Sequence, residues 1–269
     1  MTATEPQTRR DSATAMPVFA PLFTAGTESV TVRWLNLTYD IDADLAREIL
    51  PSCLDVPPRP EAGLWLAEFI EAEFRGESGA IERRPNYMQG GVSIQCAKAG
   101  ELGAYALETF VEGLNHGILG RELFGLPKKQ AQHVRVDERS NRVEFAITTS
   151  DSTLLLEGTA HFAAAGPVDE SVAPYWFEQH YTIKAIPSAE GNGFDISRLV
   201  RIPWQFSTQA PVSCGEAQLH WARTPSDPLY LLAPQSSIKA RYGHGRLDIA
   251  YGTYLDEITH FPTFGTPSW

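Results

Sequence analysis

The chain has 269 residues, of which 43% are hydrophobic and 20% are charged, so it can fold around a sizeable core. Its formal net charge of -11 would repel a phosphate backbone, and its 22 Lys and Arg residues are scattered, so we expect no nucleic-acid partner. No apolar run reaches the roughly 18 residues that a membrane-spanning helix needs, so we expect a soluble protein without a membrane partner.

The N-terminal end and the cysteines differ from those of a secreted protein. Residues 1–19 are polar and lack the apolar stretch of a secretory signal, so we predict a disordered arm followed by one domain over residues 20–269. Residues 163–174 are the best candidate for an internal boundary, but similar strand patterns lie on both sides. Cys53, Cys96 and Cys214 are far apart and lack CxxC spacing, which indicates neither a disulfide framework nor a zinc site. These features favour a cytoplasmic location.

The chain is predicted to consist mainly of strands. From Val30 to Tyr39, β-branched and aromatic residues alternate with polar ones, as in a half-buried strand. Asp42 then caps a predicted helix that stops at Pro51. Further strands are predicted at residues 64–74, 92–97, 104–111, 134–137, 143–149, 154–162, 181–186, 217–222 and 246–254, and short helical turns at 113–121 and 196–200. This spacing favours a mainly β (α+β) fold, an antiparallel β-barrel or sandwich with a few peripheral helices.

Several common chemistries are excluded because their motifs are missing. The chain has no GxSxG, HExxH or GxxxxGK[ST] motif, and GNGFDI from Gly191 lacks the third glycine of a dinucleotide-binding loop. The seven histidines show no paired ligand spacing. We therefore predict no metal and no cofactor.

The segment from Gly120 to Lys129, GRELFGLPKK, is the feature that indicates a reaction. Two adjacent lysines after a proline are otherwise typical of a solvated turn. An amine attacks a ketone only when it is neutral, and at a pKa of about 10.4 roughly one lysine in 2500 is neutral at pH 7. The ammonium of Lys129 and the apolar residues of the same segment would both lower the pKa of Lys128.

This segment resembles the acetoacetate decarboxylase superfamily, whose members carry a GRE-x-x-x-x-P-K-K motif. In that superfamily the first lysine forms a Schiff base and the second lowers its pKa, and acetoacetate decarboxylase is itself a known example of an activated lysine. Residues 68–70 (EFI), 87–91 (YMQGG) and 180–187 (HYTIKAIP) are similar to further segments of the superfamily. The resemblance covers most of residues 30–190, and it implies the superfamily's fold and a homo-oligomer.

The resemblance also implies roles for individual residues. Lys128 would be the nucleophile and Lys129 its electrostatic neighbour. Glu68 would be an acid or base near the imine, or alternatively an outward-facing charge on a strand. Arg121 and Glu122 look like members of the motif that support or bind the substrate, since an Arg can hold a carboxylate with two hydrogen bonds, or else a salt-bridged helix end.

Two positions depart from the superfamily pattern. Where the decarboxylases have a second active-site glutamate, this chain has Gln89. An amide can donate a hydrogen bond to a carboxylate that the reaction retains, and this replacement resembles the aldolase-dehydratase branch of the superfamily. The superfamily arginine of the first strand aligns with Val32, one residue from Arg33. This offset would turn Arg33 to the other side of the strand, and we keep Arg33 as a candidate substrate-binding residue. The loop between Glu68 and Tyr87 is also longer, which suggests a different entrance to the pocket.

Tyr230, in DPLYLLAP, is a further candidate because a phenol near an iminium could assist hydration or dehydration. The alternative is an aromatic side chain that fills the core.

We therefore predict a cofactor-free lyase that forms an imine with a keto acid. The leading hypothesis is aldol condensation, dehydration or hydration of pyruvate or another 2-oxo acid, with an aldehyde as a possible second substrate. The first alternative is decarboxylation of acetoacetate or another 3-oxo acid, for which Glu68 alone would suffice. The second is a non-catalytic small-molecule-binding barrel in which Lys128 is only an electrostatic anchor.

Overall fold

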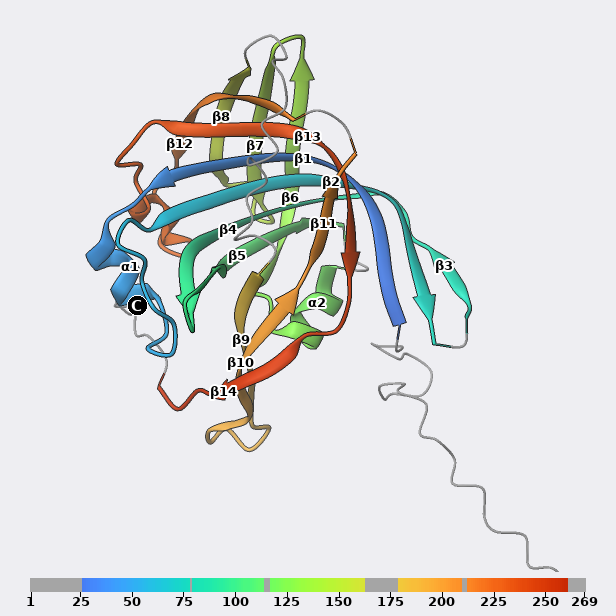
Figure 1. The fold of residues 1–269 in the computed structure, drawn as a ribbon, viewed down its shortest axis with the longest axis vertical. Helices are drawn as coiled ribbons and strands as arrows, with labels where there is room; N and C mark the ends of the chain where they lie inside the picture. Colours follow the sequence, from blue (N-terminus) through green and yellow to red (C-terminus); the bar gives the residue numbers. More distant parts are fainter. Residues whose placement is uncertain (1–25, 78, 114–116, 163–178, 210–211, 261–269) are drawn as a thin grey trace, which may run out of the picture.

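The structure is a computed structural model that describes residues 26–77, 79–113, 117–162, 179–209 and 212–260 (Figure 1). The expected arm at residues 1–19 and the candidate boundary at residues 163–174 lie outside these ranges. The helices are α1 (Ala43–Ile49), α2 (Gly117–Phe124) and a short 3-10 helix (Pro228–Leu231). The strands are β1 (Gly26–Asp40), β2 (Glu61–Gly76), β3 (Ile81–Arg83), β4 (Tyr87–Lys98), β5 (Glu101–Glu112), β6 (Lys128–Arg139), β7 (Arg142–Thr149), β8 (Leu154–Phe162), β9 (Gln179–Pro187), β10 (Phe194–Pro203), β11 (Gln205–Thr208), β12 (Ser213–Trp221), β13 (Ile238–Ile249) and β14 (Thr253–Glu257).

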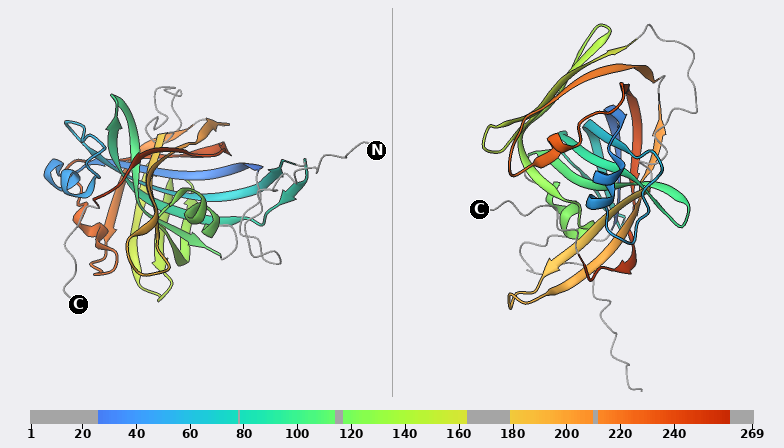
Figure 2. Two further views of the ribbon diagram at one scale, coloured as in Figure 1. Left: turned by 90° about the horizontal axis from the view of Figure 1, so that it is seen from below. Right: turned by 90° about the vertical axis from the view of Figure 1, so that its left-hand side faces the viewer.

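These strands form one sheet that closes on itself. Their order is β14-β10-β9-β5-β4-β2-β1-β13-β12-β8-β7-β6, and β5 also pairs with β6, so β9, β10 and β14 extend from a closed ring. The β5–β6 and β5–β9 pairings are parallel, whereas the other pairings are antiparallel. In Figure 1 the long strands β1 and β2 bend around α2, and Figure 2 shows the same arrangement from two further sides. The prediction of a mainly β fold is confirmed.

Strand register assigns the side chains of β1, β2 and β4 to two faces. Trp34 pairs with Ala67, and Ala67 pairs with Gln89, so these three side chains share one face. Arg33 and its partner Glu68 occupy the adjacent row. Because side chains alternate along a strand, this second row points to the opposite face.

Both faces of β1 and β2 are covered by apolar side chains. The main core lies on one face and includes Leu37, Leu64 and Phe145, which are 1% exposed or less. A second cluster on the other face contains Val32, Trp34 and further buried residues, namely Val30, Ala67, Phe69, Ala72 and Leu247. Burial of each large apolar side chain contributes roughly 1.5–3 kcal/mol, so both clusters stabilise the curved sheet.

The helix after β1 begins as predicted. The Asp42 side chain accepts hydrogen bonds from the backbone N–H groups of Asp44 and Leu45, and the helix ends before Pro51. Among the described residues, no helix has the length and apolar character needed to cross a membrane.

Some predicted boundaries were wrong. Residues 196–200 were expected to form a helical turn, but they lie inside β10, which pairs with β9 and β14 on its two edges. The tertiary pairing overrides the local helical pattern there. Residues 246–254 were expected as one strand but are divided between β13 and β14. The short strands β3 and β11 were not predicted.

Candidate active site

Lys128 lies at the first position of β6 and borders a cavity of about 190 Å³. Its Nζ donates a hydrogen bond to Oε1 of Gln89, at 2.9 Å. Gln89 is 5% exposed and borders the same cavity. Burial lowers the pKa of Lys128 from 10.5 to about 8, against the opposing charge of Glu28. The site therefore contains an amine that loses its proton far more readily than an ordinary lysine does.

The turn between α2 and β6 directs Lys128 toward the cavity. Gly125 ends α2 with a φ of 80°, a conformation that favours glycine. Its carbonyl accepts a hydrogen bond from Thr182 of β9, and the Lys184 ammonium of β9 donates to the carbonyl of Leu123. Strand β9, which carries the HYTIKAIP segment, therefore holds this turn in place.

Gly120 of α2 leaves room for the lysine side chain. A Cβ atom at this position would lie 2.9 Å from both Cε and Nζ of Lys128. Real Cβ atoms do not approach other heavy atoms so closely, so a larger residue would displace the amine. The first glycine of GRELFGLPKK thus has a packing role beside Lys128.

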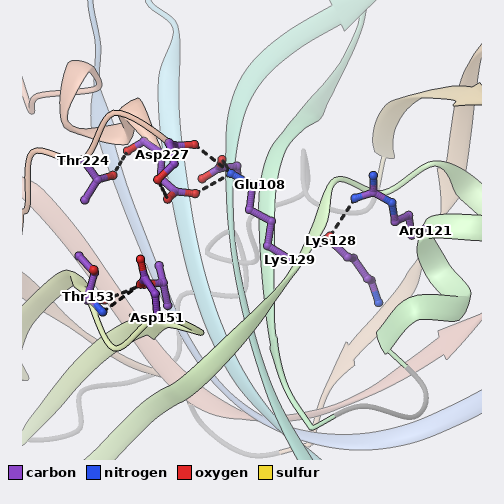
Figure 3. A network of polar contacts seen from close by, with 10 residues as sticks. Glu108, Arg121, Lys128, Lys129, Asp151, Thr153, Thr224 and Asp227 are labelled. Carbon is purple, nitrogen blue, oxygen red and sulfur yellow. Dashed lines mark hydrogen bonds and ion pairs between the residues drawn. The ribbon is translucent and has the colours of Figure 1, made fainter. Parts of the chain in front are cut away.

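Lys129 points away from Lys128. Its ammonium donates hydrogen bonds to Glu108 at 2.5 Å and to Asp227 at 2.6 Å, and Figure 3 shows the two lysines directed apart. These carboxylates raise the pKa of Lys129 despite the opposing effect of its burial, and burial raises the pKa of Glu108 to about 7. The expected electrostatic pairing of the two lysines is not the arrangement seen: the cause of the low pKa of Lys128 is burial.

Arg121 and Glu122 lie on the exposed side of α2. Arg121 donates a hydrogen bond from Nη1 to the backbone carbonyl of Lys128 at 3.0 Å, which Figure 3 shows. This contact ties α2 to the first residue of β6. Neither Arg121 nor Glu122 borders the cavity.

Arg33 and Glu68 pair with each other on the face of the sheet opposite Lys128's cavity. Their ion pair is 2.8 Å long, and Arg33 also donates hydrogen bonds to the Val136 carbonyl and the Tyr242 hydroxyl. The residue before Arg33, Val32, borders the cavity instead. The structure therefore does not bring Arg33 or Glu68 together with Lys128.

Tyr230 also lies away from this cavity. It belongs to the short 3-10 helix Pro228–Leu231, and the Arg223 guanidinium lies 5.3 Å from the centroid of its ring. It is not among the residues that line the cavity.

Within the described ranges, the charged side chains that line the cavity are those of Lys128, Glu28 and Arg84. Glu28 and Arg84 form an ion pair with each other, with exposed fractions of 10% and 8%. Neither residue was among those predicted from the sequence. Arg84 directly follows β3, in the segment between Glu68 and Tyr87 that was expected to be a longer loop. The structure instead forms the end of β2 and the strand β3 there, and these two strands pair with each other. The extra length of this segment was the signal that could have indicated Arg84.

Aromatic side chains form much of the remaining lining. Phe74 lies beneath the Arg84 guanidinium, whose central carbon is 4.7 Å from the ring centroid. His180 stacks on the Trp204 ring with 4.1 Å between centroids. Six of the lining residues form what we call the aromatic wall: Trp34, Trp65, Phe69, Phe74, Trp204 and Phe206.

No group of three or more His, Cys, Asp or Glu side chains with the arrangement of a metal site occurs in the described part of the chain. The described cavity lining supplies one partly neutral amine, an amide and a buried ion pair, together with the side chains of Tyr87, His180 and Tyr251.

Comparison with known proteins places the chain in a family. A family model described as acetoacetate decarboxylase (ADC) matches residues 15–258. The acetoacetate decarboxylase of Burkholderia ambifaria (strain MC40-6) is 26% identical over 247 residues, covering 90% of this chain and 94% of that protein. The solved acetoacetate decarboxylase of Legionella pneumophila subsp. pneumophila str. Philadelphia 1 is 16% identical with a TM-score of 0.77, covering 97% of this chain and 100% of that one. MppR, an enduracididine biosynthesis enzyme solved in complex with pyruvate, is 16% identical with a TM-score of 0.69, covering 87% of this chain and 92% of that one.

The family model spans most of the chain, including both residues of the hydrogen bond between Lys128 and Gln89. The protein therefore belongs to the acetoacetate decarboxylase family and is a lyase.

Proposed function

We propose that Lys128 forms an imine with a 2-oxo acid such as pyruvate, and that the enzyme uses this imine for aldol condensation, dehydration or hydration. The observation that carries the proposal is the buried amine with a pKa of about 8, held 2.9 Å from the amide oxygen of Gln89. At pH 7 roughly a tenth of such an amine is neutral, which is about three-hundredfold more than for a lysine of pKa 10.5.

Imine formation at Lys128 proceeds in balanced steps. The neutral amine attacks the keto carbon and forms a C–N bond. The former keto oxygen then leaves as water, after it has gained one proton from the nitrogen and one from the surroundings. The iminium that results keeps one N–H, which can donate to the Gln89 oxygen just as the amine does.

The iminium then acts as an electron sink. Loss of a proton from the carbon next to the former keto group gives an enamine, which attacks the carbonyl carbon of an aldehyde and forms a C–C bond. Loss of water from this adduct gives an unsaturated iminium, and hydrolysis of the C–N bond restores Lys128. The negative charge of Glu28, which favours a cation at Lys128, would stabilise the iminium.

Gln89 supports a reaction in which the carboxylate of the substrate is retained. An amide carries no charge to repel a carboxylate and can donate a hydrogen bond to one. MppR, whose fold this chain shares, has been solved with pyruvate and with the condensation product of pyruvate and imidazole 4-carboxaldehyde. An aldehyde is therefore the proposed class of second substrate.

Decarboxylation of a 3-oxo acid is the second candidate. The curated relatives that match over about 90% of the chain are named acetoacetate decarboxylase, and much of the cavity lining is apolar. In that reaction the bond to the carboxylate breaks, its electrons move to the iminium nitrogen, and carbon dioxide leaves.

Borohydride trapping tests the imine. The protein is incubated with pyruvate or acetoacetate, reduced, and analysed by intact mass. We expect an adduct with the unmodified protein and with Lys239→Met, a control at an exposed position of β13, but none with Lys128→Met. Absence of an adduct with every keto acid would contradict both candidate reactions.

Gln89→Glu distinguishes the two reactions. A carboxylate 2.9 Å from Nζ favours the cationic nitrogen, so we expect the pH profile to move to higher pH and release of carbon dioxide from acetoacetate to rise. An unchanged rate across the pH range would show that the amide is not the determinant. Rapid release by the unmodified enzyme would instead favour the decarboxylase.

A further inference from the structure

Arg84 lines the cavity and has hydrogen-bonding capacity beyond its contact with Glu28. Its guanidinium pairs with Glu28 through Nη1. Its Nε is buried and lies 3.7 Å from the carboxylate of Glu82, too far for a hydrogen bond, and has no other partner among the described residues. A guanidinium has five N–H donors in a planar fork, so Arg84 can hold a second carboxylate beside Glu28.

The charges in the cavity would balance with such a ligand bound. The ion pair of Glu28 and Arg84 is neutral as a whole, and the Glu82 carboxylate, 3.7 Å from Nε of Arg84, is 57% exposed and lies outside the cavity lining. Lys128 reacts as a neutral amine. A keto acid brings one negative charge, and conversion of Lys128 to an iminium adds one positive charge. Buried charges require partners, and this ligand would leave none unpaired.

The size and lining of the cavity exceed what pyruvate needs. An apolar protein cavity of about 150 Å³ holds a benzene molecule. This cavity is about 190 Å³ and is bordered by the aromatic wall, which offers ring faces and edges for stacking. The three carbons of pyruvate would leave much of that apolar surface uncovered.

We propose that the cavity takes a keto acid with an aromatic or similarly bulky apolar group, which packs on the aromatic wall while Arg84 binds the carboxylate and Lys128 attacks the keto carbon. This inference rests on the proposed function, because it needs the imine at Lys128. It extends that function by naming the carboxylate anchor and the class of substituent. In this arrangement Glu28 holds Arg84 in place and supplies the negative charge near the iminium.

A comparison of two keto acids tests whether the cavity prefers an aromatic substituent. The unmodified full-length enzyme is titrated with pyruvate and with phenylpyruvate, each trapped with borohydride and quantified by intact mass. We expect half-maximal trapping with phenylpyruvate at a concentration at least tenfold lower than with pyruvate. Equal concentrations, or a preference for pyruvate, would overturn the inference.

Arg84→Met tests the anchor, with Arg83→Met as the matched control because the Arg83 side chain is 85% exposed. We expect Arg84→Met to raise the half-maximal phenylpyruvate concentration about tenfold or more, as for loss of a charged hydrogen bond. Trapping of 4-phenylbutan-2-one, which has no carboxylate, should change by less than twofold. An equal loss with this neutral ketone would refute the anchoring role.

Arg84→Met leaves Glu28 buried without its partner, so Arg84→Met/Glu28→Gln is measured in parallel and should show the same selective loss for phenylpyruvate. The outcomes also separate the two proposals. Trapping of pyruvate without preference for phenylpyruvate contradicts this inference alone. Failure to trap any keto acid contradicts the proposed function as well.

Discussion

Replacement of Lys129 by Met would show whether a neighbouring charge or burial sets the pKa of Lys128. Burial lowers that pKa from 10.5 to about 8, a difference worth about 3 kcal/mol. The ammonium of Lys129 lies on the other side of β6, paired with Glu108 and Asp227. We therefore expect Lys128 to titrate near pH 8 both in Lys129→Met and in the unmodified enzyme.

The assay is the initial rate of trapping pyruvate with cyanoborohydride as a function of pH. The neutral amine is the reactive form, so the rate should rise with pH through a midpoint at the pKa of Lys128. A midpoint near 10 in the variant would lower the neutral fraction at pH 7 about a hundredfold and would refute burial as the cause. Lys129→Arg keeps a cation at this position and is the matched control.

Stability has to be measured alongside this profile. Removal of the Lys129 ammonium leaves Glu108 and Asp227 without their cation, at a cost of about 1–3 kcal/mol. The thermal midpoint of Lys129→Met should fall accordingly. Lys129→Met/Asp227→Asn removes one of the carboxylates and should recover part of the loss, without any change in the pKa of Lys128.

Three further predictions concern the surroundings of the amine. Gly120→Ala places a Cβ 2.9 Å from Nζ of Lys128, so trapping at pH 7 should fall at least tenfold while thermal unfolding shows a folded protein. For stability, native Lys128 loses its proton near pH 8 whereas the unfolded chain keeps it up to pH 10.5, so the free energy of unfolding should rise with pH over that window. Lys128→Met should remove this rise. At pH 7 it should also stabilise the fold by about 1–2 kcal/mol, which is less than the difference of about 3 kcal/mol from the pKa shift because Gln89 loses its hydrogen-bond donor. Denaturant titration at several pH values measures both effects. Glu68→Gln should change trapping by less than twofold, because Glu68 pairs with Arg33 on the opposite face, and a tenfold loss would show that this assignment of faces is mistaken.

The fold was predictable where local pattern and tertiary structure agree. Alternating residues from Val30 to Tyr39 fall within β1, and the cap at Asp42 starts α1, because both signals are local. The prediction of a helical turn from Ile196 to Val200 was wrong because this segment pairs with a strand on each side, which its local pattern does not reveal. The parallel pairing of β5 with β6 closes the ring of strands, and the hydrophobic periodicity of the sequence does not predict which strands pair.

The candidate site could be predicted only in part. The motif identified Lys128, and the superfamily pattern identified Gln89, which the structure places within hydrogen-bonding distance of each other. The direction of Lys129 follows from a rule that sequence reasoning could have applied: adjacent residues on a strand face opposite sides. Arg84 follows β3 and Glu28 lies near the start of β1, and no motif encodes the contact between them.

The charges around Lys128 affect both the choice of substrate and the balance between the two candidate reactions, aldol-type chemistry and decarboxylation. Loss of carbon dioxide is fastest where the carboxylate is poorly stabilised and the iminium is well stabilised. Glu28 supplies negative charge near the nitrogen, which serves either reaction. A carboxylate bound to Arg84, in contrast, is stabilised by charged hydrogen bonds that would weaken as its electrons leave, so the same contact that selects a keto acid opposes its decarboxylation. If Arg84 anchors the carboxylate as proposed, it and the Gln89 amide would act in the same direction, toward a reaction that starts from the imine and keeps the carboxylate.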